Sequence, residues 1–138
     1  MLDDKVADFI SSNHKAVLTT YRENGNAQMS IIVVGPYRGG AAFTTTADRA
    51  KLRNLMRDAR CSLLVSQESW WGFLVLEGQA EILSPENTDA EGLQQTLRGV
   101  YRSISGEHPD WEEYDQAMRD ERRSAVIVTP DRVYGTAL

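Results

Sequence analysis

The strongest constraint on the fold is a series of three short β-type segments joined by turns at the start of the chain. Residues 16–21 (AVLTTY) and 27–34 (AQMSIIVV) flank the turn sequence ENGN, and 41–46 (AAFTTT) follows a glycine-rich turn over 35–40. An Asn-Gly pair between two β-type runs is a strong hairpin signal. Because short turns join antiparallel neighbours, these segments predict a three-stranded antiparallel meander.

Helical spacing of apolar residues recurs in four other segments. A short amphipathic helix is expected at the N-terminus, with Asp3 as its N-cap. A second helix is expected over 49–59, with Asp48 as its N-cap. Capping-box spacing at Thr88 opens a third helix, and 108–110 begins a fourth.

Further extended segments are expected at 61–66 and at 71–83, the second with a bulge at Gly78. The C-terminal sequence SAVIVTPDRVYG is either a pair of strands or one strand bent at Pro130. Six or so antiparallel strands with helices inserted between them predict a single α+β domain over 1–138, built as a small barrel.

Composition and charge exclude several classes of protein. The single cysteine, Cys61, excludes an intramolecular disulfide and a CxxC metal site. No apolar run approaches the roughly 18 residues of a membrane span, and the acidic N-terminus is unlike a signal peptide. We therefore expect a soluble cytoplasmic protein. The net charge of −5 argues against nucleic acid as a partner.

Basic residues are concentrated in one segment of this acidic chain. Five of the 15 lysines and arginines lie between Arg49 and Arg60. Arg49, Lys51 and Arg53 fall at the start of the expected helix, where the helix dipole disfavours each cation by about 0.3–1 kcal/mol. Together with Thr44–Thr46, these residues predict a phosphate site. The alternative is a solvated basic face paired with the acidic segment 107–121.

Other candidate residues have less specific patterns. Gln28 and Ser30 lie on one face of a strand, where they would either bind the edge of a heterocycle or face solvent. Trp70 and Trp71 would either wall a ring or fill the core. No hydrolase, kinase or zinc motif is present, and the histidines lack metal-ligand spacing. We therefore predict no metal site and assign no catalytic residue; a cofactor would supply the reactive group.

The sequence resembles the pyridoxamine 5′-phosphate oxidase-like split β-barrel proteins, especially their branch of coenzyme F420-dependent oxidoreductases. The resemblance rests on GNAQMS, RAKLRNLMRDAR, WWGFLVLEGQAEI, VYRSISGEHPDWEEYDQAM and the terminal VYG. It implies a six-stranded antiparallel split β-barrel (the FMN-binding split barrel) with flanking helices. It also implies a homodimer with two cofactor clefts between the subunits.

The resemblance also implies roles for individual residues. The cofactor phosphate would be held by the loop and helix that contain Thr44, Thr45, Arg49 and Lys51, with Asn54 near by. The strand containing Gln28, Met29, Ser30 and Ile31 would run along the flavin-like ring. Trp71 would enter the cleft from the opposite subunit.

Two departures from this family affect the expected function. The second strand, MSIIVVG, lacks the arginine that contacts the FMN phosphate in pyridoxamine-phosphate oxidases, and a C-terminal basic substrate motif is missing. Oxidation of vitamin B6 is therefore not expected. The leading hypothesis is hydride transfer from reduced F420 to a small organic acceptor. The alternatives are an FMN-dependent reductase or oxidase, and a non-catalytic protein that binds a flavin, deazaflavin or tetrapyrrole.

Overall fold

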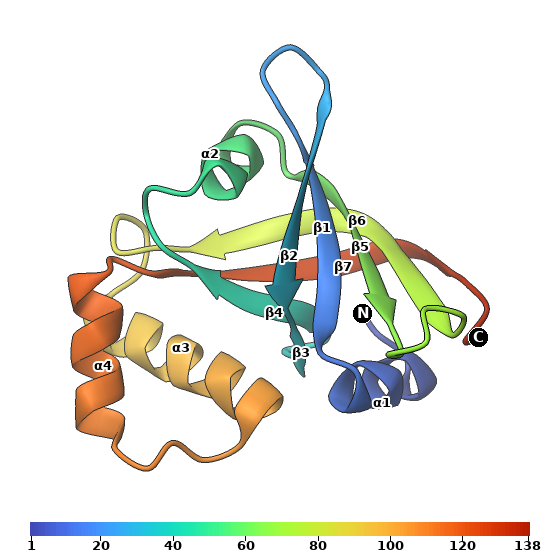
Figure 1. Cartoon of the computed structure of the whole chain (residues 1–138). Helices are drawn as coiled ribbons and strands as arrows, with labels where there is room; N and C mark the ends of the chain where they lie inside the picture. The colour runs from blue at the N-terminus through green and yellow to red at the C-terminus, as the bar shows by residue number, and fades with distance from the viewer.

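A computed structural model describes all 138 residues as one curled antiparallel sheet with four helices (Figure 1). The strands follow the order β2-β1-β5-β6-β7-β4-β3 across the sheet, and every neighbouring pair is antiparallel. Their bounds are β1 (Lys15–Tyr21), β2 (Ala27–Val33), β3 (Gly35–Tyr37), β4 (Gly40–Thr45), β5 (Arg60–Ser66), β6 (Phe73–Leu83) and β7 (Ser124–Tyr134). The helices are α1 (Asp4–Ser12), α2 (Ala50–Arg57), α3 (Ala90–Ser105) and α4 (Trp111–Asp120).

The sheet has seven strands, so the expectation of six was wrong. The additional strand is β3, which pairs with β4 inside the segment expected to be a turn. The expected meander is also wrong beyond its first hairpin, because β4 pairs with β7 and not with β2. β2 and β3 are consecutive in the chain but form opposite edges of the sheet, so the sheet curls into a half-barrel.

The main core lies inside the curl of the sheet. Val6 and Ile10 of α1 and Leu52 and Leu55 of α2 pack there against the inner side chains of the strands, among them Phe43. Both helices show the apolar spacing expected of an amphipathic helix on a core. The Asp3 carboxylate accepts a hydrogen bond from the Val6 N–H at 2.9 Å, so the expected N-cap of α1 is confirmed.

A second core holds α3 and α4 against the outer side of β4 and β7. Leu97 and Val100 of α3 and Tyr114 of α4 pack there on Ala42 and Ile127. Because both faces of β4 and β7 are covered, their buried residues form continuous runs and do not alternate. In Figure 1, α3 and α4 lie beside each other on one side of the sheet. None of the helices is long and apolar enough to span a membrane.

The bulge expected at Gly78 is confirmed, since the pairing of β6 with β7 changes register between Glu77 and Gly78. β7 is a single strand through Pro130, which pairs with Gly78. A Cβ atom on Gly78 would lie 2.0 Å from the Thr129 carbonyl oxygen. Only glycine therefore allows the two backbones to approach this closely.

Replacing Gly78 by alanine is expected to lower the free energy of unfolding by about 1–3 kcal/mol, because the two central strands must move apart. Urea denaturation followed by circular dichroism measures this change. The matched control is Gln79→Ala at the exposed neighbouring position, for which we expect little effect. A G78A variant as stable as the control would contradict the steric argument.

Candidate functional site

A cavity of about 670 Å³ opens between β2, the end of β4, the start of α2 and the helices α3 and α4. Four basic residues line it: Lys15, Arg49, Lys51 and Arg123. No carboxylate lines it. Its remaining wall combines the hydroxyls of Thr44–Thr46 with apolar side chains from β2 and α3. An excess of cations in a concave, partly apolar site favours an anionic ligand.

The cations of this cavity are largely without counter-ions. Lys15, Arg49 and Lys51 form no ion pair with a carboxylate, whereas Arg123 pairs with Glu121 at 2.8 Å. Burial, with repulsion from Arg49 and Arg123 added to it, lowers the pKa of Lys51. An anion in the cavity would relieve this repulsion.

The acidic segment 107–121 does not neutralise the basic cluster, contrary to the alternative considered above. Three of its carboxylates form ion pairs, all with arginines outside the basic segment 49–60: Glu107 with Arg102, Asp115 with Arg98, and Glu121 with Arg123. The guanidinium of Arg53 instead donates to the carbonyl oxygen of Asp48.

The start of α2 differs from the expectation. The helix covers Ala50–Arg57, and its N-cap is Arg49, not Asp48. No side chain caps the first turn, because the Asp48 carboxylate accepts a hydrogen bond from the Thr46 hydroxyl at 2.7 Å. The N–H groups of Leu52 and Arg53 both donate to the Arg49 carbonyl, but those of Ala50 and Lys51 have no such partner. An anion could accept hydrogen bonds from these two N–H groups and pair with the side chains of Arg49 and Lys51.

Arg123 is a cavity residue that the sequence pattern did not reveal. Its Nη1 donates to the Thr44 hydroxyl at 3.0 Å, and its charge contributes to the lowered pKa of Lys51. It directly precedes β7, whose first residue Ser124 pairs with Thr45. The pairing of β4 with β7 is the signal that would have identified Arg123, and it joins residues about 80 positions apart in the sequence.

The structure brings five of the ten predicted cofactor-binding residues into the cavity. These are Ile31, Thr44, Thr45, Arg49 and Lys51. The others, which do not line it, are Gln28, Met29, Ser30, Asn54 and Trp71. Met29 and Ile31 are 68% and 74% exposed on the outer face of β2, and Trp71 is 84% exposed in the loop between β5 and β6.

Asn54 is buried and ties α2 to the sheet. Its side-chain amide donates to the Thr20 hydroxyl at 3.1 Å and to Gln28 Oε1 at 2.9 Å. Its Oδ1 accepts a hydrogen bond from Arg57. The hydrogen-bonding groups of Asn54 are thus used within the chain, and Gln28 is drawn toward α2 by the same contact. Asn54 positions the basic start of the helix.

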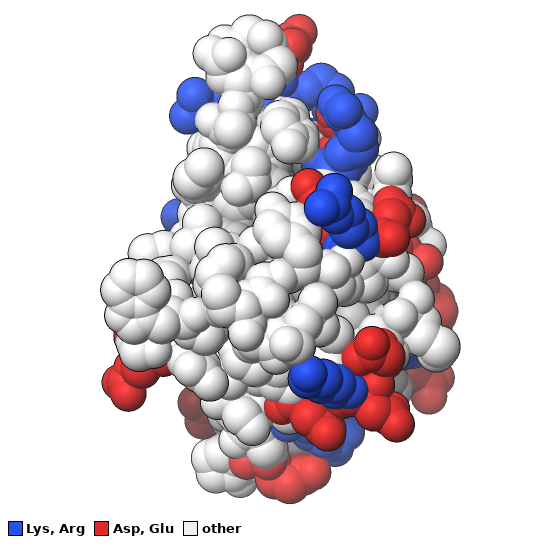
Figure 2. All heavy atoms as spheres, turned by 90° about the vertical axis from the view of Figure 1, so that its right-hand side faces the viewer, with Lys and Arg blue, Asp and Glu red and all other residues white.

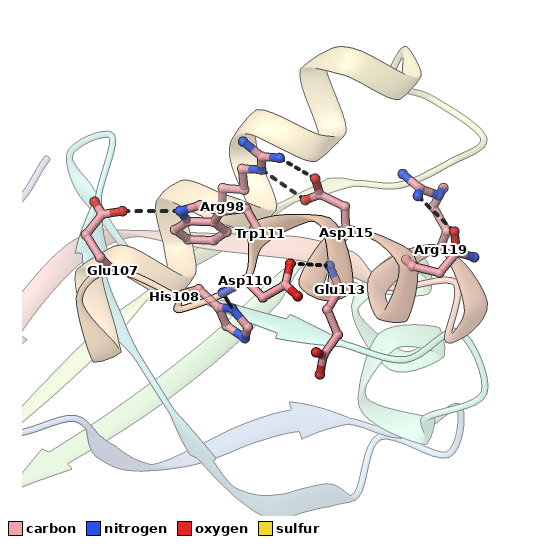
Figure 3. Close-up of polar contacts among 9 residues, drawn as sticks. Arg98, Glu107, His108, Asp110, Trp111, Glu113, Asp115 and Arg119 are labelled. Atoms are coloured by element: carbon pink, nitrogen blue, oxygen red, sulfur yellow. Dashed lines mark hydrogen bonds and ion pairs between the residues drawn. The ribbon is translucent and has the colours of Figure 1, made fainter.

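The helical wall of the cavity is held by an aromatic cluster. Tyr101, His108, Trp111 and Tyr114 lie with ring centroids 5.1–5.7 Å apart. Figure 3 shows Glu107 accepting from the Trp111 indole, and Arg98 facing Asp115 across α3 and α4. The Tyr114 hydroxyl donates to the Leu97 carbonyl, and burial raises its pKa to about 12. Tyr101 and Tyr114 therefore form a fixed wall.

Cys61 is buried in the core, and burial raises the pKa of its thiol to about 12. Because the thiolate is the reactive form, Cys61 is expected to resist iodoacetamide at pH 8 in the native protein and to react in urea. Mass spectrometry of the intact chain measures the modification. Rapid native alkylation would show that the N-terminal half of the core opens readily.

The chain forms a half-barrel sheet with a cavity lined by basic residues beside its edge strand β2. Residues 2–137 match the family model described as pyridoxamine 5′-phosphate oxidase. The chain belongs to this family. The family includes oxidoreductases, and its members typically bind flavin.

Solved structures share the fold at low sequence identity. A conserved hypothetical protein from Mycobacterium tuberculosis is 24% identical, with a TM-score of 0.76 over 96% of this chain and 82% of its own. An F420 reductase is 17% identical, with a TM-score of 0.67 over 92% of this chain and 94% of its own. A heme-binding protein from Mycobacterium smegmatis is 15% identical, with a TM-score of 0.66 over 99% of this chain and 56% of its own.

Proposed function

We propose that this protein is an oxidoreductase that binds coenzyme F420 in the large cavity and passes a hydride from the reduced deazaflavin to a small organic acceptor. The observation that carries the proposal is the cavity lined by four cations and no carboxylate. Its donor set fits a phosphate, and its apolar wall fits a flat ring. When bound, the reduced cofactor would supply the hydride.

The residues at the cationic end would hold the phosphate. Arg49, Lys51 and Arg123 supply charge, and Thr44 and Thr45 supply hydroxyls. The ring would lie along β2 near Ile31, as the family resemblance implies. β2 is an edge strand, so part of its backbone N–H and C=O groups have no partner in the sheet. These groups are available to the polar edge of a heterocycle.

A second copy of the chain would complete the cleft. An apolar row crosses five strands on the outer face of the sheet. Its residues lie in register and are Ile31, Val17, Leu64, Val75 and Tyr134. Ile31 also lines the cavity, so the row and the cavity are continuous. The two ends of the row, Ile31 and Tyr134, are 74% and 40% exposed. Exposed apolar side chains on one sheet face support a homodimer through this face.

The neighbouring region of the surface also has few charges. Figure 2 shows a broad area without charged side chains on the side that carries the β5–β6 loop and the C-terminal end of β7. Trp70 and Trp71 of this loop are 56% and 84% exposed. In a dimer through the sheet face, this loop would reach the partner's cleft, and Trp71 would form part of its wall.

The test of the cofactor is a comparison of F420 and FMN. Each is titrated into the purified protein and followed by fluorescence. The proposal expects tighter binding of F420, whereas equal or tighter binding of FMN would favour an FMN-dependent reductase or oxidase of the same fold. A protein that purifies yellow with bound FMN would support that same alternative.

One observation favours a non-catalytic binding protein as the second candidate. No histidine or carboxylate lines the cavity, so the two commonest kinds of general acid are missing from it. Stopped-flow oxidation of the bound reduced cofactor by quinones, enones and biliverdin separates the two functions. Absence of turnover with every acceptor would favour a protein that binds or stores the cofactor.

A further inference from the structure

A second cavity, of about 260 Å³, lies between α3, α4 and the segment that precedes α3. Leu93, Leu97 and Met118 form its apolar part, and Arg119, Arg122 and Arg123 surround them with positive charge. Met118 and Arg123 also line the large cavity, so these two side chains separate the two sites. The family resemblance assigns no role to this cavity.

The charge balance of the second cavity is positive. Its single acidic residue, Asp115, is bound by Nε and Nη2 of Arg98. Arg119 lies one turn further along α4 (Figure 3), and its guanidinium bonds the amide oxygen of Gln116 but no carboxylate. Arg122 reaches Glu86 at 3.2 Å, but both side chains of this pair are more than 60% exposed. An ion pair between two exposed side chains contributes little free energy, so a ligand anion can compete with Glu86 for Arg122.

The backbone at Arg122 is in a conformation that a side chain strains. The end of α4 has the hydrogen bonds of a Schellman motif, with the Arg123 N–H donating to the Met118 carbonyl at 3.0 Å and Arg122 to Arg119 at 3.1 Å. In this motif Arg122 adopts the left-handed conformation, with φ of 51°. Glycine is favoured there because a side chain is strained. The structure thus accepts strain at a position where an arginine faces a cavity.

We propose that the second cavity is a binding site for a small organic anion with an apolar body, such as an aryl or short aliphatic monocarboxylate. The carboxylate would lie between Arg119 and Arg122, and the body would lie against Leu93, Leu97 and Met118. The volume is below the roughly 300 Å³ at which drug-sized ligand sites begin, so the ligand is small. This site does not depend on the cofactor of the large cavity.

The test is a titration of the ¹⁵N-labelled full-length protein with benzoate at constant ionic strength, followed by amide chemical shifts. Saturable shifts are expected at residues 93–97 and 119–123. Benzyl alcohol, which has the same apolar body without the charge, is expected to bind roughly tenfold more weakly, since it lacks the charge-assisted hydrogen bonds. Shifts that do not saturate, that occur only around Thr44–Lys51, or that benzyl alcohol reproduces would overturn the proposal.

Two variants separate a binding role from a structural one. Arg122→Gly removes the guanidinium and the backbone strain together, so it is expected to be as stable as the parent protein or more stable while binding benzoate roughly fivefold or more weakly. Arg119→Ala is expected to weaken benzoate binding without changing the backbone. The control Arg60→Ala, far from the cavity in the sequence and paired with Asp58, should bind as the parent does. Full benzoate affinity in both R122G and R119A would overturn the proposal.

Discussion

Replacing Lys51 by alanine is expected to weaken cofactor binding tenfold or more, because one charge-assisted hydrogen bond to a phosphate contributes about 1.5–3 kcal/mol. Lys51 lies half-buried in the cavity without a carboxylate partner, so its removal leaves no unpaired acid behind. Folding should be nearly unaffected. Isothermal titration with F420, together with a thermal melt of each protein, measures both effects.

The matched control is Lys5→Ala, which removes an exposed lysine from α1. This variant is expected to bind the cofactor as the parent does. Binding should also be more sensitive to salt in the parent than in K51A, since one fewer cation contacts the ligand. Unchanged affinity of K51A for the cofactor would contradict a phosphate site at this end of the cavity. It would also contradict the proposed orientation of the cofactor.

Placing an arginine at Leu64 is expected to dissociate the proposed dimer. Leu64 lies in the middle of the apolar row across the sheet, where a second copy would bury the new charge without a partner. The loss should exceed about 3 kcal/mol of association free energy, or roughly a hundredfold in the dissociation constant. Sedimentation equilibrium measures the mass, which should fall from about 31 kDa to 15.5 kDa.

The control for Leu64→Arg is Ser11→Arg, which adds the same charge on the exposed side of α1. The far-ultraviolet circular dichroism of both variants should match the parent, because Leu64 is on the outer face and outside the main core. A parent protein of 15.5 kDa at high concentration would contradict the dimer directly. L64R that stays dimeric would place the interface on another surface.

Features that depend on neighbours in the sequence could be predicted. The Asn-Gly turn between β1 and β2, the Asp3 cap and the bulge at Gly78 all follow from short-range preferences, and all are present. The cap of α3 was off by one residue, since Asp89 accepts the hydrogen bond and Thr88 does not. Neighbouring Thr and Asp compete for the same role, and local pattern does not separate them.

Features that depend on distant pairing could not be predicted. β3 is three residues long, and it exists because β4 provides a partner and α3 covers it. Pairing of β4 with β7 brings Arg123 to Thr44, and no periodicity in the sequence carries that information. Of the candidate site, the basic residues at the start of α2 could be recognised from the sequence, because the helix dipole disfavours cations at a helix N-terminus.

Asn54 changes how binding data on this protein should be interpreted. Its side-chain amide hydrogen-bonds to one residue on each of two strands, so it fixes the position of α2 and of the basic residues at the start of that helix. Asn54 itself does not line the cavity. A substitution at this position would lower the affinity for the ligand because α2 and its basic residues shift, and not because a contact with the ligand is lost. Mutational mapping alone would count Asn54 among the contacts, and only the crystal structure of a complex would correct that assignment.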